Sequence, residues 1–394
     1  MNLQLTGHHH GRDHGRDFGR NSGLDTLRAL AIVLVFMNHY MIFVSFRPTF
    51  GWMSEIGWAG VDLFFALSGY LIGNQILSGI RRQQTGPERF SLPRFYARRF
   101  LRTLPNFYFV LALYALWPYW RGESVLPPLW KFITFTQNIQ LMPGTAFSHA
   151  WSLCVEEQFY VLLPAVALLI AACRKSLLWA WVAVIGSLLA GMAVRGYLWN
   201  EQAGVGGLYY YTNIYYASWC RFDELVFGVA LALVKNYHAG AWKVITSRGN
   251  WALAAGAGML ALTWSMFLED HYGYMMTVVG YPMLGVGFTL LLIAALSPGS
   301  LLQRWRVPGA ASIALWSYAI YLTHKQLCVL LRVPLRGYGW GPDTWQAIAI
   351  MSLASVLVGW LLFLLVETPF MKLRDRFVPG NFARPKAAPE VLTA

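Results

Sequence analysis

Apolar residues occur in long runs along most of this chain, and short polar stretches separate the runs. Each run holds about 20 residues, the length at which an α-helix crosses the hydrocarbon core of a bilayer. The pattern therefore predicts an all-α polytopic membrane protein, a bundle of about ten transmembrane helices. The ten predicted spans are 25–46, 57–78, 103–120, 150–172, 177–199, 217–234, 250–268, 275–296, 310–331 and 345–366.

Basic residues are concentrated in the connections that follow the even-numbered spans. Seven arginines follow the second span alone, namely Arg81, Arg82, Arg89, Arg94, Arg98, Arg99 and Arg102. Lysine and arginine are enriched in cytoplasmic loops of membrane proteins. We therefore expect both termini to be cytoplasmic, with Arg332 and Arg336 as the one pair on the opposite side.

The composition agrees with a membrane protein. Of 394 residues, 57% are hydrophobic and 12% are charged, whereas a soluble domain carries about 25% charged residues. The net charge of +13 indicates cytoplasmic loops and contacts with anionic lipid, and it does not imply nucleic acid. The four cysteines lack metal-type spacing, so we expect no metal site. Residues 1–22 and 379–394 are expected to be disordered tails around a membrane domain at 23–378.

The first span carries two ionisable residues, Arg28 and His39. On a helix they lie on one stripe, roughly 16 Å apart along the axis. Such residues inside a span usually face a bundle interior or a wet cavity. In the alternative interpretation, Arg28 anchors the inner interface and His39 lies in the outer headgroup layer.

Polar residues also interrupt the second span and the connection after it. Asp62, Ser68 and Gly69 stand in an otherwise apolar run, where they either line a polar cavity or serve helix packing. Further on, a helix would align Arg94, Arg98 and Arg102 on one face, with Arg99 beside them. Arginine suits bidentate phosphate contacts, so this row indicates either a site for a phosphate-bearing ligand or a topology signal.

Carboxylates mark the start of the fourth span. Glu156 lies one helical turn after Ser152, and Glu157 and His149 are close by; two adjacent carboxylates at this place are hard to explain as packing. Before the sixth span, a tyrosine-rich loop is followed by Arg221, Asp223 and Glu224. The loop is either an interfacial belt or a surface for sugar stacking. Later spans add His324, Lys325 and Glu367.

In this order, these stretches resemble the acyltransferase-3 family of integral membrane acyltransferases. The matching segments are Arg28 to His39, 61–71 (VDLFFALSGYL), 149–160 (HAWSLCVEEQFY), 221–223 (RFD), 317–324 (SYAIYLTH) and 367–370 (ETPF). The resemblance implies a ten-helix bundle that moves acyl groups, usually acetyl from acetyl-CoA, to hydroxyls of envelope or exported glycans. Many relatives carry an extra extracytoplasmic hydrolase-like domain, which we do not expect within this chain.

The resulting hypothesis is an O-acetyltransferase of the bacterial inner membrane. His39 is the expected general base, because histidine is suited to proton transfer near neutral pH, and Glu156 and Arg28 are further catalytic candidates. Acetyl-CoA is expected near Arg28, Arg94, Arg98, Arg99, Ser68 and Gly69. The glycan or lipid-linked acceptor is expected near Asp62, His149, Trp151, Ser152, Arg221 and Asp223. Direct transfer and an acyl-enzyme relay both fit, and a secondary transporter or glycan flippase is the alternative function.

Overall fold

The computed structural model describes residues 21–86, 89–201, 206–380 and 382–383. A helix lies in each predicted span, so the all-α prediction is confirmed. These helices are α1 (Ser22–Tyr40), α3 (Ala59–Thr85), α4 (Leu92–Leu116), α7 (Trp151–Ala171), α8 (Ser176–Glu201), α10 (Asp223–Tyr237), α12 (Gly249–Glu269), α13 (Tyr281–Leu296), α15 (Ala310–Gly337) and α16 (Trp345–Leu362).

Shorter elements connect or extend these helices. The short α-helices are α2 (Trp52–Ile56), α5 (Pro118–Arg121), α6 (Leu129–Ile133), α9 (Gly206–Tyr210), α11 (Ala239–Ser247), α14 (Leu301–Arg304) and α17 (Thr368–Phe377). The π and 3-10 segments are η1 (Met41–Ser45), η2 (Ser148–Ala150), η3 (Tyr211–Tyr215), η4 (Ser218–Cys220), η5 (Met276–Gly280) and η6 (Phe363–Glu367). The strands β1 (Arg89–Phe90) and β2 (Phe382–Ala383) pair in antiparallel fashion.

Among the described residues, seven helical stretches are long and apolar enough to cross a membrane. They contain α1, α3, α7, α8, α12, α13 and α16. The chain is thus a multi-pass membrane protein. The other three predicted spans correspond to α4, α10 and α15. The helix α4 carries four arginines, and the 15 residues of α10 extend only about 22 Å. Crossing by these three helices, and hence the count of ten, stays a prediction.

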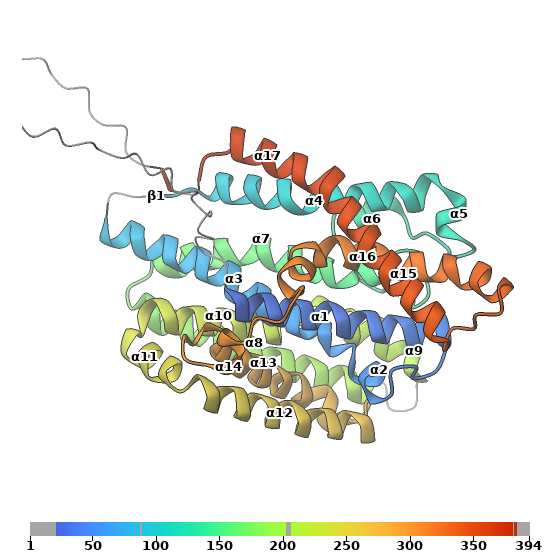
Figure 1. Ribbon diagram of the computed structural model, residues 1–394. Coiled ribbons are helices and arrows are strands. Elements are labelled where there is room, and N and C mark those ends of the chain that lie inside the picture. Colours follow the sequence, from blue (N-terminus) through green and yellow to red (C-terminus); the bar gives the residue numbers. More distant parts are fainter. Residues whose placement is uncertain (1–20, 87–88, 202–205, 381, 384–394) are drawn as a thin grey trace, which may run out of the picture.

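Both ends of the described bundle lie on the same side of it. Figure 1 shows the first turn of α1 and the last turn of α17 at one end of the molecule. There Ser22 Oγ donates to the carbonyl of Gln303 at 2.9 Å, and Arg98 donates to the carbonyl of Val378 at 2.8 Å. The predicted N-terminal tail lies outside the described residues except for its last two positions. In the predicted C-terminal tail, β2 pairs with β1.

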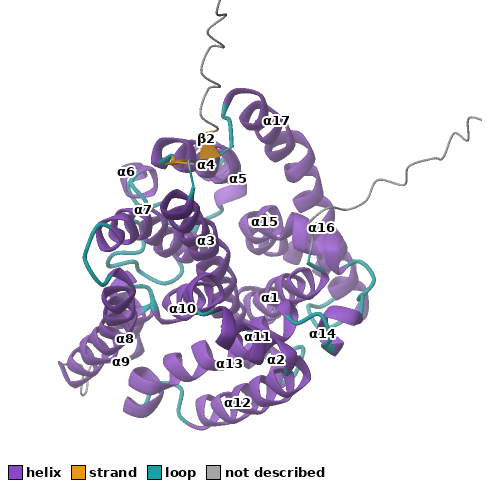
Figure 2. Ribbon diagram, turned by 90° about the vertical axis from the view of Figure 1, so that its left-hand side faces the viewer, coloured by secondary structure: helices purple, strands orange, loops and turns teal. Residues whose placement is uncertain are grey.

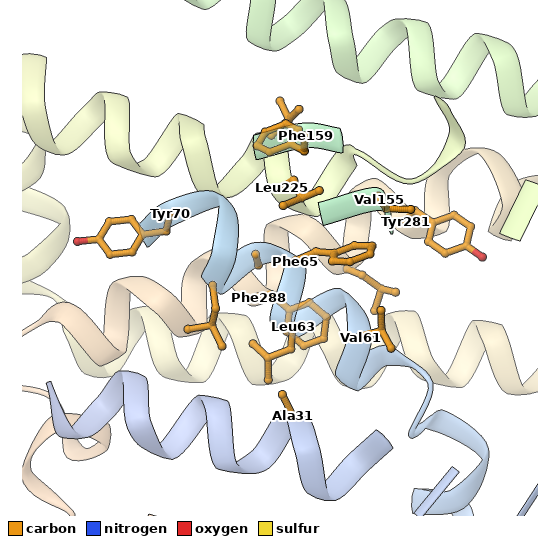
Figure 3. Packing of buried hydrophobic residues seen from close by; sticks show 14 of the residues in the cluster. Ala31, Val61, Leu63, Phe65, Tyr70, Val155, Phe159, Leu225, Tyr281 and Phe288 are labelled. Atoms are coloured by element: carbon orange, nitrogen blue, oxygen red, sulfur yellow. The ribbon is translucent and has the colours of Figure 1, made fainter. Parts of the chain in front are cut away.

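The helix α3 lies at the centre of the core. Figure 2, which looks along the bundle, shows it surrounded by α1, α7, α10 and α15. In Figure 3, apolar side chains of α3 meet residues of α1, α7, α10 and α13. Among them Leu63 and Leu225 are fully buried. The buried surface of α3 thus fixes the positions of the helices that carry the polar residues described next.

Two glycines allow α3 and α10 to approach closely. A methyl group at Gly69 would overlap the backbone carbonyl of Leu225, and one at Gly228 would overlap the backbone of Ala66 and Tyr70. Glycine is the residue that permits such close contact between helices. Gly69, which the sequence analysis placed beside the acyl donor, instead lies against α10.

Candidate active site

A cavity of about 440 Å³ lies between α1, α3, α4, α7 and α15. Its lining is about half polar, in contrast to the apolar surfaces of the same helices that form the core. The polar side chains that line it are Arg28, Ser68, Gln75, Arg99, Arg102, Thr103, Ser152, Glu156, Glu157, Tyr160, Ser317, Tyr318, Tyr321 and Glu367. Four of the predicted catalytic or donor-binding residues, Arg28, Ser68, Arg99 and Glu156, are therefore brought together here.

Helical spacing explains how α7 contributes to the cavity. Ser152, Glu156 and Tyr160 follow one another at four-residue intervals, so they lie on one face of the helix. Glu156 Oε1 accepts a hydrogen bond from Ser68 Oγ of α3 at 2.9 Å. The neighbouring Glu157 is more deeply buried and has a different partner. Its Oε1 lies 3.5 Å from the guanidinium of Arg99.

The positive charge of the cavity comes from α1 and α4. The guanidinium of Arg99 lies 3.8 Å above the centre of the Tyr160 ring, which holds it against the cavity wall. Arg28 and Arg102 line the same cavity. Arg98 points elsewhere, to the Val378 carbonyl and to Asp375 at 3.1 Å. Of the three predicted phosphate-binding arginines of α4, Arg99 lines the cavity, whereas Arg94 and Arg98 do not.

Three histidines form a cluster beside the cavity. His39 Nδ1 and His324 Nε2 are 2.8 Å apart, and the two rings are parallel. His149 meets both rings edge-on, with ring centres 6.0 Å apart in each case. Next to them, Lys325 Nζ donates to Ser148 Oγ at 3.0 Å. This cluster combines residues of α1, α15 and η2 that are far apart in the sequence.

Tyr321 separates the cavity from the histidine cluster. Its hydroxyl donates to the backbone carbonyl of His149 at 2.6 Å and lies 2.7 Å from Ser152 Oγ. Its ring centre is 6.5 Å from that of His39. Tyr321 lines the cavity, whereas the three histidines are not among the described residues that do. The cavity thus ends one aromatic ring away from His39.

Four residues expected to contact the acceptor lie in a separate buried cluster. Asp62 forms an ion pair with Arg221, and both side chains are fully buried. Asp223 receives two hydrogen bonds from Arg195. The Arg221 guanidinium also lies 5.2 Å from the Trp151 ring centre. These residues tie α3, α7, α8 and α10 together and do not line the cavity, unlike Ser152 from the same predicted set.

Several residues that line the cavity were not among the predicted site residues. Tyr160 continues the four-residue spacing of Ser152 and Glu156, so its position was available from the helical period. Tyr321 stands in the same segment as His324, three residues before it. Tyr318 stands in that segment as well. Thr103 and Gln75 gave no comparable signal, because single polar residues of this kind are common in helices that pack internally.

The cavity and the histidine cluster are built from the motifs found in the sequence. A comparison with known families identifies the family to which the chain belongs. A family model described as an acyltransferase domain matches residues 21–364. The chain belongs to the acyltransferase-3 family. The match includes the cavity and cluster residues up to α16 and leaves out only the last turns of the helical region, where Glu367 lies.

Three bacterial proteins illustrate what this acyltransferase-3 chain is similar to. The chain is 26% identical over 374 residues to the peptidoglycan O-acetyltransferase OatA of Listeria monocytogenes, covering 89% of this chain and 55% of that protein. The putative peptidoglycan O-acetyltransferase YrhL of Bacillus subtilis is 27% identical over 370 residues, covering 88% and 54%. The O-acetyltransferase OatA of Staphylococcus aureus is 24% identical over 391 residues, covering 92% and 60%.

The chain therefore spans little more than half the length of these relatives. No solved structure matches it. The family membership is thus supported by the sequence match, and the candidate active site by the positions of its residues in this structure.

Proposed function

We propose that the protein is an O-acyltransferase that moves an acetyl group from acetyl-CoA to a hydroxyl of a cell-envelope or exported glycan. One observation carries this proposal. A cavity with Arg28, Arg99 and Arg102 along its wall ends at Tyr321, directly beside His39. An anionic donor can be held by such arginines, and a histidine can take the proton of a hydroxyl. The names of the relatives support a peptidoglycan-like acceptor.

The proposed reaction exchanges a thioester for an oxygen ester. The acceptor oxygen attacks the thioester carbonyl carbon while His39 takes the hydroxyl proton. The new carbon–oxygen bond forms, the carbon–sulfur bond breaks, and CoA leaves as a thiol after receiving that proton. An acyl-enzyme relay would divide the same exchange into two steps. The donor would enter the cavity with its thioester next to Tyr321, and the acceptor hydroxyl would meet it there beside His39.

Replacing Arg99 with Gln should weaken the binding of acetyl-CoA, because Arg99 is a cationic side chain on the cavity wall. Arg98→Gln is the matched comparison, since the adjacent Arg98 binds Val378 and Asp375 instead. Apparent acetyl-CoA affinity, measured on purified protein, should fall more in Arg99→Gln than in Arg98→Gln. Equal affinity in the wild type and Arg99→Gln would show that this arginine serves packing or topology alone.

The two adjacent carboxylates are expected to differ in their roles. Glu156 lines the cavity and is bound by the neutral Ser68 hydroxyl, whereas Glu157 is paired with Arg99. Glu156→Gln should therefore abolish acetyl transfer at normal protein level, while Glu157→Gln should act mainly by releasing Arg99 and weakening donor affinity. Transfer rates at saturating acetyl-CoA separate these effects. An inactive Glu157→Gln beside an active Glu156→Gln would reverse the assignment.

The proposed location is the bacterial inner membrane, with both termini in the cytoplasm. The support is that the basic segments after α3, α10 and α13 lie at the end of the bundle where α1 begins and α17 ends (Figure 1). Reporter fusions after Arg82, Arg174, Arg248 and Arg306 should all report the cytoplasm. A periplasmic signal at any two of these positions would contradict the orientation.

The test of the function is the release of CoA. Purified protein in lipid should convert acetyl-CoA to free CoA when a glycan acceptor is present, and the acceptor should gain an acetyl ester. Chromatographic detection is preferable to a thiol dye, because Cys173 is a free and exposed thiol. A transporter or flippase, the alternative function, would release no CoA under these conditions.

A further inference from the structure

The hydrogen bonds of the histidine cluster define which nitrogen carries each proton. His324 Nδ1 lies 2.9 Å from the backbone carbonyl oxygen of Ile320. A carbonyl oxygen only accepts, so His324 Nδ1 must carry a hydrogen. In a neutral imidazole the other nitrogen then holds a lone pair. His324 Nε2 is therefore an acceptor, and it lies 2.8 Å from His39 Nδ1.

The same reasoning fixes the tautomer of His39. Because His324 Nε2 accepts, His39 Nδ1 must donate, which leaves the lone pair of His39 on Nε2. The ring planes are parallel to within 3° and their centres lie 5.0 Å apart, which suits an in-plane hydrogen bond between nitrogens that are 2.8 Å apart. The hydrogen bonds thus form a chain in which His39 Nδ1 donates to His324 Nε2 and His324 Nδ1 donates to the Ile320 carbonyl.

The neighbouring groups leave this arrangement in place. His149 Nε2 lies 3.2 Å from the backbone carbonyl of Leu322, so that nitrogen carries its hydrogen, and His149 Nδ1 forms no hydrogen bond with the described residues. Lys325 donates to Ser148, and the Tyr321 hydroxyl donates to the His149 carbonyl. His324 is therefore the group that sets the orientation of His39.

We propose that His324 is a positioning residue that holds His39 as the tautomer protonated on Nδ1, with Nε2 ready to accept the proton of the acceptor hydroxyl. This inference rests on the proposed function, in which His39 is the base. When His39 takes a proton, its Nδ1–H bond to His324 becomes charge-assisted and hence stronger. His324 thereby both orients the base and stabilises its protonated form, without contacting the substrate.

Three variants test this role. His324→Leu removes the acceptor, whereas His324→Gln supplies an amide oxygen that can accept from His39 Nδ1. Transfer should fall by about tenfold or more in His324→Leu, but by less than the roughly 10²–10⁴-fold expected for loss of the base itself, and His324→Gln should recover part of it. His238→Ala is the matched control, because His238 also forms an interhelical bond, accepting from Trp181 Nε1 at 3.0 Å, and should retain wild-type transfer.

A spectroscopic measurement reports the tautomer directly. Protein with ¹⁵N-labelled histidine in lipid nanodiscs should show His39 with a protonated Nδ1 and an unprotonated Nε2, the signal being assigned by its loss in His39→Ala. In His324→Leu this signal should become that of mixed tautomers, and His324→Gln should restore it.

The possible failures are distinguishable. An unchanged His39 tautomer in His324→Leu, or equal transfer losses in His324→Leu and His324→Gln, would overturn the positioning role and leave His324 as a packing residue. Normal transfer by His39→Ala would instead overturn the proposed base, while the ¹⁵N measurement would still decide whether His324 fixes the ring of His39.

Discussion

Membranes that contain His39→Ala are expected to accumulate normal amounts of protein and to lose acetyl transfer by roughly 10²–10⁴-fold, the usual contribution of a general base. A sugar hydroxyl attacks a thioester slowly unless a base takes its proton. His39 is placed for this task because its ring lies beside the end of the cavity, on the far side of Tyr321. Its side chain is only partly buried.

Transfer of labelled acetyl groups, normalised to the amount of protein, provides the measurement. Arg28→Ala should differ from His39→Ala by impairing mainly the use of acetyl-CoA, because Arg28 lines the cavity and lies away from the histidine cluster. Transfer near the wild-type level in His39→Ala would rule out the base. An inactive variant at His149 would then point to the neighbouring ring.

Replacing Arg221 with Met is expected to destabilise the fold by about 3–5 kcal/mol, the usual cost of leaving one partner of a buried ion pair behind. Both Arg221 and Asp62 are fully buried. The guanidinium also lies over aromatic rings, 4.3 Å from the centre of Tyr281 and 4.7 Å from that of Tyr215. Replacing Arg221 therefore leaves a buried carboxylate without its counter-charge and removes the cation from between the rings.

Thermal unfolding of the purified protein in detergent should show this loss as a lower midpoint. The double variant Asp62→Asn with Arg221→Met should recover part of it, because no uncompensated charge remains. Arg47→Gln is the comparison, since the Arg47–Asp343 pair is exposed and such surface pairs contribute little. A midpoint for Arg221→Met that equals the wild type would show that the buried pair does not hold α3 and η4 together.

Hydropathy and helical spacing were sufficient to predict the all-α architecture and part of the candidate site. The apolar runs located every long helix, and the four-residue spacing placed Ser152 and Glu156 on one face of α7. The spacing was less informative for α4, where it grouped Arg98 with Arg94 and Arg102. Adjacent residues differ by about 100° around a helix, so Arg98 and Arg99 point in different directions. Which of the two lines the cavity becomes clear only from the structure, where Arg98 contacts Asp375 of α17 and Arg99 lines the cavity.

Pairings between distant helices could not be predicted from the sequence. The partner of Asp62 is 159 residues away, and the partner of His39 is 285 residues away. No local pattern specifies such contacts, because they depend on how complete helices pack. The sequence also could not show that Asp62, Arg221 and Asp223 form buried ion pairs, because structural ion pairs and functional charges have the same signature in a hydrophobic segment.

The position of Tyr321 also bears on how tightly the membrane is sealed. Polar side chains occur on both sides of this ring, from Arg28 in the cavity to Lys325 beside the histidines. A continuous file of water along them would let protons cross the bilayer and would dissipate the gradient across it. Tyr321 lies between these two groups, and its hydroxyl is held by Ser152 and the His149 carbonyl. We therefore expect this ring to interrupt such a file and to limit proton leakage through the bundle.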